Sequence, residues 1–190
     1  MFLFKKHSDE QRLVKRLRNG ENGAMQEFLA FYADYLTGTC ARYIVDEEDV
    51  KDVLQESLIH IITHIHDYEY RGSGSLKAWA TKIVVNESLR FLKSSQQHEL
   101  IQLERDIPDE PEENDPPFSD IPPDEIQKMI NQLPAGYRMV FCLYVFENKS
   151  HQEIAALLGI KEKTSSSQLY RAKNLLAKII RQYNEKQSKR

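Results

Sequence analysis

The stretch SHQEIAALLGIKEKTSSSQLYRAKNLL, residues 150–176, decides how the second half of this chain folds. Ser150 and Glu153 stand at the spacing of a capping box, which begins a helix by satisfying two backbone N–H groups. Gly159 then allows a tight turn, because glycine adopts backbone conformations that are costly for other residues. A second helix follows, with apolar residues at helical spacing along one side. The pattern predicts a helix–turn–helix.

The second of these helices carries polar and basic residues at its start and on its other faces. They are Lys161, Lys163, Thr164, Ser166, Ser167, Gln168, Arg171 and Lys173. Hydroxyls, an amide and cations in the N-terminal half of a helix are suited to contacting phosphates and base edges. The segment therefore favours DNA binding over its alternative, an ordinary helical hairpin with a solvated face.

Charge is distributed unevenly along the chain, although the total is only −3. Residues 1–98 are nearly neutral, residues 99–125 hold one basic and 11 acidic side chains, and residues 126–190 hold 12 basic and four acidic ones. Phosphate contact is therefore expected of the C-terminal part. The acidic segment also contains six of the seven prolines, which is typical of an extended linker. Such a linker is either a passive spacer or a segment that threads a basic channel in a partner or mimics nucleic acid there.

The part before the linker is also helical in pattern. Apolar residues recur every three or four positions in four successive segments. Asn22 and Asp46 stand where they can cap the second and third of these helices, and Ser75 where it can cap the fourth. The third helix carries a wide apolar stripe that includes Ile61 and Ile62.

The expected fold is all-α. Two small helical domains, 8–94 and 124–184, are joined by the acidic, proline-rich linker 95–123, and the second domain contains the helix–turn–helix.

Composition favours a soluble, cytoplasmic protein without catalytic activity. No apolar run approaches the ~18 residues of a transmembrane helix, and the N-terminus lacks the features of a signal peptide. Cys40 and Cys142 stand far apart in apolar helical contexts, which predicts buried, reduced thiols. His60 and His64 share a helical face, but no further ligand completes a metal site, so neither a metal nor a cofactor is expected. No phosphate-binding loop, dinucleotide fingerprint or serine elbow occurs.

Three runs occur in a telling order: DEEDVKDVLQES at 46–57, SLKAWATKIVVNESLRFLK at 75–93, and LPAGYRMVFCLYVFENKSHQEIAALLGI at 133–160. Through them the chain resembles bacterial sigma factors, specifically the extracytoplasmic-function group of the sigma-70 family. Ser165 departs from the family pattern, which usually has an apolar residue facing the first helix of the motif at that position. Arg90 and Lys161 also replace residues that are commoner in the family.

The resemblance implies that the chain binds core RNA polymerase and directs initiation at specific promoters. It assigns polymerase binding to Asp49, Asp52, Gln55 and Glu56. It assigns recognition and melting of the −10 element to Arg71, Lys82, Asn86, Arg90 and Lys93, and binding of the −35 element to the polar residues of the helix–turn–helix given above. The implied partners are core polymerase, promoter DNA and an inhibitory anti-sigma factor.

Two other classes of protein remain compatible with these patterns. One is a helix–turn–helix regulator that is not a polymerase subunit. The other is a helical adaptor that binds only protein.

Overall fold

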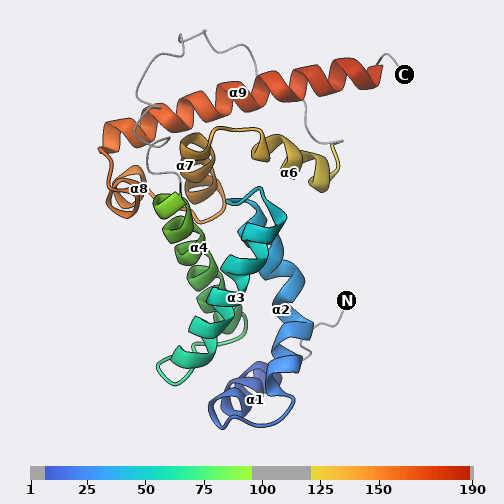
Figure 1. The fold of residues 1–190 in the computed structure, drawn as a ribbon, viewed down its shortest axis with the longest axis vertical. Coiled ribbons are helices and arrows are strands. Elements are labelled where there is room, and N and C mark those ends of the chain that lie inside the picture. Colours follow the sequence, from blue (N-terminus) through green and yellow to red (C-terminus); the bar gives the residue numbers. More distant parts are fainter. Residues whose placement is uncertain (1–6, 96–120, 189–190) are drawn as a thin grey trace. The chain divides into compact units, whose positions relative to one another are not determined.

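The computed structural model describes residues 7–95 and 121–188, so nearly all of the expected linker lies outside the described residues. Every regular element within these ranges is a helix, which confirms the predicted all-α fold (Figure 1). The chain divides into two compact units, Met1–Phe91 and Leu92–Arg190. Each unit is described by itself.

The first unit is built from four helices. They are α1 (His7–Arg18), α2 (Ala24–Ala41), α3 (Glu47–His64) and α4 (Ser75–Ser95), the last of which runs past the unit boundary. Asp46 caps α3 as predicted, because its Oδ1 accepts hydrogen bonds from the backbone N–H groups of Glu48 and Asp49. The cap expected from Asn22 is wrong. Gly23 is the N-cap of α2, at φ +80°, and no side chain caps that helix.

The apolar sides of the four helices form one core. Leu13 of α1, Phe28 of α2, Ile61 of α3 and Leu76 of α4 are each no more than 1% exposed. The prediction that Ile62 belongs to the buried stripe is wrong, because Ile62 is 51% exposed. Successive residues of a helix point about 100° apart, so Ile62 lies at the edge of the apolar side of α3, where the neighbouring helices do not cover it.

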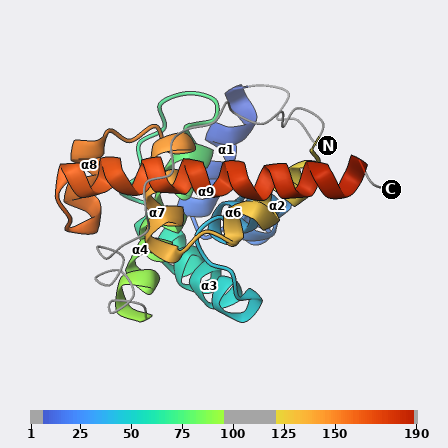
Figure 2. The same ribbon diagram turned by 90° about the horizontal axis from the view of Figure 1, so that it is seen from above.

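The second unit is organised around one long helix. Its elements are α6 (Pro123–Asn131), α7 (Ala135–Val145), α8 (His151–Leu158) and α9 (Glu162–Ser188). Both views show α8 at the N-terminal end of α9, with α6 and α7 along its length (Figures 1 and 2). Far along α9, Ile180 packs with Met129 of α6. The contact with α6 therefore lies far along α9, whereas α8 lies beside the first turns of α9.

A buried arginine joins α6 to α7. Arg138 is 5% exposed, and its guanidinium donates to the carbonyl oxygens of Asn131 and Leu133, at 3.2 and 2.8 Å. These carbonyls lie at the end of α6, where helical acceptors lack partners within the helix. Pro134 follows directly and is the N-cap of α7. The Leu-Pro…Arg pattern is thus a device that ends one helix and starts the next.

Both cysteines, Cys40 and Cys142, are buried and free, as predicted. Among the described helices, none combines the length and apolar character that crossing a membrane requires.

Candidate polymerase and nucleic-acid interfaces

The acidic residues of α3 lie on its outer side. Asp52, Gln55 and Glu56 are exposed and Asp49 is half-buried, while the neighbouring Val53 belongs to the core. The capped first turn also holds Glu47 and Glu48, which are favourable at the positive end of the helix dipole. The polar residues expected to contact polymerase therefore share one surface, although their role in binding remains a prediction.

This acidic surface continues into an apolar one. Ile59 is 45% exposed and Ile62 is 51% exposed. They follow Gln55 and Glu56 at helical spacing, so charge and exposed apolar area lie along the same side of α3. Sequence reasoning missed this extension, because the period of the stripe alone does not mark where its buried part ends.

The outer face of α4 carries polar and basic residues. Lys82, Asn86 and Arg90 are all exposed, and their spacing of four residues places them in one row. Lys93 is half-buried in the last turn of the helix. The structure thus gathers three of the residues that the sequence assigned to the melted promoter strand.

The loop before α4 is closed by its own side chains. The Ser75 hydroxyl accepts a hydrogen bond from the Arg71 N–H at 3.1 Å, donates to the Gly72 carbonyl at 2.6 Å, and lies 2.6 Å from the Tyr68 hydroxyl. Tyr68 is buried, and its ring lies 5.0 Å from that of Trp79. Arg71 itself is exposed and paired with Glu69 at 3.4 Å. The cap expected from Ser75 is therefore directed into the loop, and the start of α4 is bonded by another residue, Glu10.

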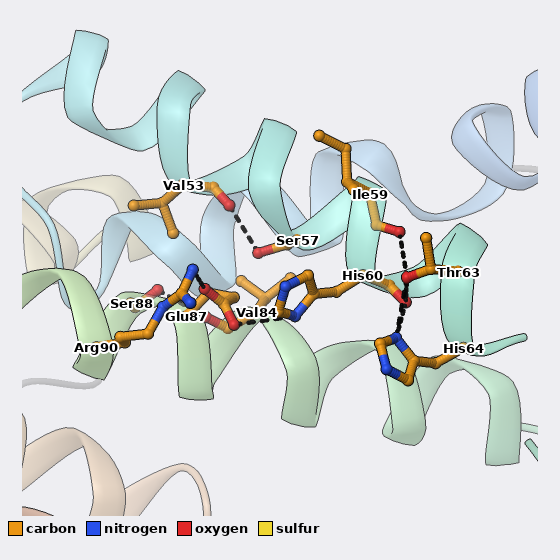
Figure 3. Close-up of polar contacts among 10 residues, drawn as sticks. All are labelled: Val53, Ser57, Ile59, His60, Thr63, His64, Val84, Glu87, Ser88 and Arg90. Atoms are coloured by element: carbon orange, nitrogen blue, oxygen red, sulfur yellow. Dashed lines mark hydrogen bonds and ion pairs between the residues drawn. The ribbon is translucent and has the colours of Figure 1, made fainter. Parts of the chain in front are cut away.

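One residue near this face was not anticipated from the sequence. Glu87 is 8% exposed, and its carboxylate joins His60 of α3, at 3.1 Å, to Arg90 of α4, at 2.5 Å (Figure 3). His64 contributes no ion pair here; its Nδ1 lies 3.0 Å from the His60 carbonyl oxygen. No three residues of metal-binding type gather anywhere in the described part of the chain. Glu87 thus connects the two helices that carry the candidate interfaces and sets the direction of Arg90.

The helix–turn–helix has the local geometry that its sequence predicted. The Ser150 hydroxyl accepts from the Glu153 N–H at 3.2 Å, and the Glu153 carboxylate accepts from the Ser150 N–H at 2.8 Å, which completes the capping box. The Glu153 carboxylate also accepts a hydrogen bond from the Ser150 hydroxyl at 3.0 Å, and its bonds from the Ser150 N–H and hydroxyl, with smaller help from Lys149, hold the pKa of Glu153 below its usual value. Gly159 ends α8 at φ +71°, in the left-handed region that glycine tolerates best. The chain then turns and enters α9.

Most of the polar residues assigned to DNA lie on the outside of α9. Lys161, Lys163, Ser166, Ser167 and Lys173 are exposed, and Thr164 and Arg171 are half-buried. The start of α9 therefore offers hydroxyl and cationic groups on its accessible sides.

Two polar side chains face inward instead. Ser165 is fully buried, and its hydroxyl lies 3.0 Å from Nδ1 of His151 on α8, so its predicted position is confirmed and its hydroxyl has a hydrogen-bond partner. Gln168 is 6% exposed, so the expectation that its amide faces a DNA groove is wrong for this structure. It lies three residues after Ser165 and four before Ala172, and therefore shares their side of the helix.

Most of the chain is similar to known bacterial transcription proteins. Residues 30–98 match the family described as Sigma-70 region 2, and residues 124–176 match Sigma-70, region 4. The ECF RNA polymerase sigma-E factor of Haemophilus influenzae is 25% identical over 185 residues, which cover 90% of this chain and 95% of the relative. The chain belongs to the extracytoplasmic-function group of sigma-70 factors. It is therefore an RNA polymerase sigma factor that directs promoter-specific initiation.

Other relatives extend over similar lengths. The RNA polymerase sigma-H factor of Pseudomonas aeruginosa is 24% identical to this sigma factor over 190 residues, covering 90% of this chain and 93% of the relative. Among solved structures, the sigma factor RpoE of Bartonella quintana, in complex with the anti-sigma factor NepR, is 19% identical. It has a TM-score of 0.49 and covers 84% of this chain and 98% of that one.

Proposed function

We propose that three surfaces of this sigma factor divide the work of initiation. The acidic side of α3 binds core polymerase, the Arg71–Ser75 loop and the outer face of α4 engage the melted −10 element, and the start of α9 binds the −35 element. The observation that supports this proposal most directly is the arrangement of α9. Exposed hydroxyls and cations follow a capped helix and a glycine turn, as in helix–turn–helix proteins that enter the major groove.

Electrostatic attraction would guide α3 to core polymerase. Asp52 and Glu56 are exposed carboxylates on one side of the helix, and a basic surface on core enzyme would be attracted to them. Charges at an accessible interface mainly set orientation and association rate, whereas desolvated apolar contacts supply affinity. Ile59 and Ile62, exposed beside the carboxylates, are suited to supply such contacts.

Promoter opening needs groups that hold an unpaired strand. Removing a base from the stack costs a few kcal/mol, so the protein must offer compensating contacts to the base and to its phosphates. Lys82, Asn86 and Arg90 form a polar row of the required kind.

Upstream recognition by α9 would come from few side chains. Arg171 and Lys163 can donate to guanine, and Ser166 and Ser167 to either a base or a phosphate. Each such contact is weak alone. Joined to the first unit by the linker, the second unit gains from a high effective concentration at the promoter.

The partners and location follow from the same proposal. The chain would act as a non-enzymatic subunit in the cytoplasm, where bacterial transcription occurs. An inhibitory anti-sigma factor is the usual partner of the group, and we expect one to cover one or more of these three surfaces.

In vitro transcription tests the proposal directly. The full chain would be added to core polymerase with a pool of genomic fragments, and we expect transcripts that start at a small set of related promoters. A chain that binds DNA but never copurifies with core would instead be a regulator outside the polymerase. A chain without any salt-dependent DNA association would favour the adaptor class.

A further inference from the structure

A carboxylate from the first helix reaches the loop that precedes α4. Glu10 of α1 is 1% exposed. Its Oε2 accepts a hydrogen bond from the Gly74 N–H at 2.6 Å, and its Oε1 accepts one from the Leu76 N–H at 2.7 Å. One side chain thus bonds two backbone groups that lie 64 and 66 residues further along the chain.

These two N–H groups need an acceptor from outside the helix. The helical ladder of α4 starts where the Ala78 N–H donates to the Gly74 carbonyl, at 3.0 Å. N–H groups before Ala78 therefore have no intrahelical acceptor. The Ser75 N–H donates to Gly72, and Glu10 serves Gly74 and Leu76. A carboxylate is favourable at this end of a helix, because it forms charge-assisted hydrogen bonds and opposes the helix dipole.

The C-terminal end of α1 contacts the start of the segment that connects α3 to α4. The Arg18 guanidinium donates to the Ile65 carbonyl at 3.1 Å and to the Tyr68 carbonyl. Helix α1 therefore holds the chain at residues 65–68 and again at residues 74–76. This segment contains Gly72 and Gly74, with φ of +115° and +85°, and glycine segments lose much conformational entropy when they are ordered.

Two buried tyrosines, Tyr32 and Tyr68, lie near Glu10. Burial, followed by the nearby Glu10 carboxylate, raises the pKa of Tyr32. Burial is likewise the main cause that raises the pKa of Tyr68, to which Glu10 adds. Both phenols are neutral at physiological pH, so neither adds a negative charge beside the Glu10 side chain.

We infer that Glu10 is a positioning residue for promoter opening, which holds the Arg71–Ser75 loop and the first turn of α4 in the conformation that meets the unpaired strand. This inference rests on the proposed role of the loop and α4. Glu10 itself is too buried to touch DNA. Its effect is preorganisation: a loop already held by hydrogen bonds loses less entropy when it binds the strand.

The first test measures the loop in the free, full-length protein. Glu10→Gln keeps the shape of the side chain but removes its charge and one acceptor oxygen. We expect amide hydrogen exchange at residues 72–77 to rise roughly tenfold. Glu27→Gln is the matched control, because Glu27 also joins α1 to its neighbour, through Arg16, but does not contact the loop. Unchanged exchange at Gly74 and Leu76 would overturn the inference.

The second test measures opening. With core polymerase and a promoter, Glu10→Gln should form the closed complex normally and react more slowly with permanganate in the melted region, while Glu27→Gln should match the parent. If exchange in Glu10→Gln rises throughout the first unit, the same two measurements are made on Glu10→Asp, which keeps the charge on a shorter side chain. Faster exchange confined to the loop together with slower opening supports the positioning role, and normal opening despite faster loop exchange refutes it.

The Asn86→Ala/Arg90→Ala variant distinguishes an error in the positioning role of Glu10 from an error in the proposed strand-binding surface. If it opens slowly while Glu10→Gln opens normally, the positioning role is refuted and the strand-binding surface stands. If both open normally, the proposed strand-binding surface itself is wrong.

Discussion

Ser165 and His151 form a polar contact inside the helix–turn–helix. The serine is fully buried and its hydroxyl lies 3.0 Å from Nδ1 of the imidazole, and the imidazole ring stacks on the exposed Tyr144 ring with the two centroids 5.1 Å apart. An apolar residue, usual in the family at position 165, cannot make this hydrogen bond. The contact therefore positions α9 against α8 by a directional bond as well as by packing.

Ser165→Ala should lower the free energy of unfolding by ~1 kcal/mol, because the buried hydrogen bond is lost. Ser166→Ala is the control. It lies one residue further along the same helix and is exposed, so both variants share the gain in helix propensity and only one loses a bond. Urea denaturation of both variants gives the comparison. Equal stabilities would show that the His151 contact contributes nothing.

Base reading and phosphate binding can be separated at two neighbouring positions of α9. Arg171→Ala should relax preference at one upstream base pair, at a cost of ~1–3 kcal/mol. Lys173→Ala should weaken binding to all DNA sequences alike, and it should lower the slope of log affinity against log salt concentration by about one unit. Selection from a randomised upstream element gives the first readout and salt titration the second. The model of recognition fails if both variants select the same sequences as the parent.

At the scale of elements, the ends of helices carry much of the local order. Asp46 starts α3, a complete capping box starts α8, and Gly159 ends it. Each of these devices uses hydrogen bonds that a helix cannot make internally. Helices α3 and α8 are therefore defined at these termini by short-range contacts, whereas the start of α4 is bonded by Glu10 of α1.

The capping box predicts a pH dependence. Because the pKa of Glu153 is lower in the folded protein than in the unfolded chain, its contribution to stability is present above the unfolded value and is lost as pH falls through the folded value. Glu153→Gln should therefore be less stable than the parent at neutral pH, and the difference should shrink below about pH 4.5. Urea denaturation across this range measures it. A difference that stays constant with pH would rule out the charge as its source.

The acidic side of α3 should be required for core binding. Asp52→Arg with Glu56→Arg should weaken association with core polymerase roughly tenfold or more without unfolding the unit, mainly through a slower association rate. Asp34→Arg with Asp67→Arg makes the same charge change at exposed sites off this surface. Titration of labelled core enzyme, with circular dichroism as a check on folding, compares the pairs. Equal weakening by both pairs would point to net charge alone.

At the scale of the whole molecule, the two units should act at separable steps. Asn86→Ala with Arg90→Ala in the first unit should leave closed-complex formation largely intact and slow opening, because these residues would meet DNA only after it melts. Lys51→Ala, which removes an exposed cation paired with Glu48, is the control. Permanganate footprinting that showed normal melting in the double variant would contradict the assignment.

Much of this protein was determined locally by its sequence. The capping box at Ser150, the turn at Gly159, the cap at Asp46 and the all-helical class were all predictable, since each depends on hydrogen bonds within a few residues or on the period of a helix. The inward position of Ser165 followed from the resemblance to the family, whose pattern usually has an apolar residue there.

Only the tertiary structure decided which residues meet across the fold. The burial of Gln168 and the exposure of Ile62 depend on how far the neighbouring elements extend over a helix face, which a periodic pattern does not state. The bonds from Glu10 of α1 to Gly74 and Leu76, and the ion pair between His60 of α3 and Glu87 of α4, join segments that lie far apart in the sequence. Such contacts form only when packing brings distant backbones together, and no local rule of spacing encodes them.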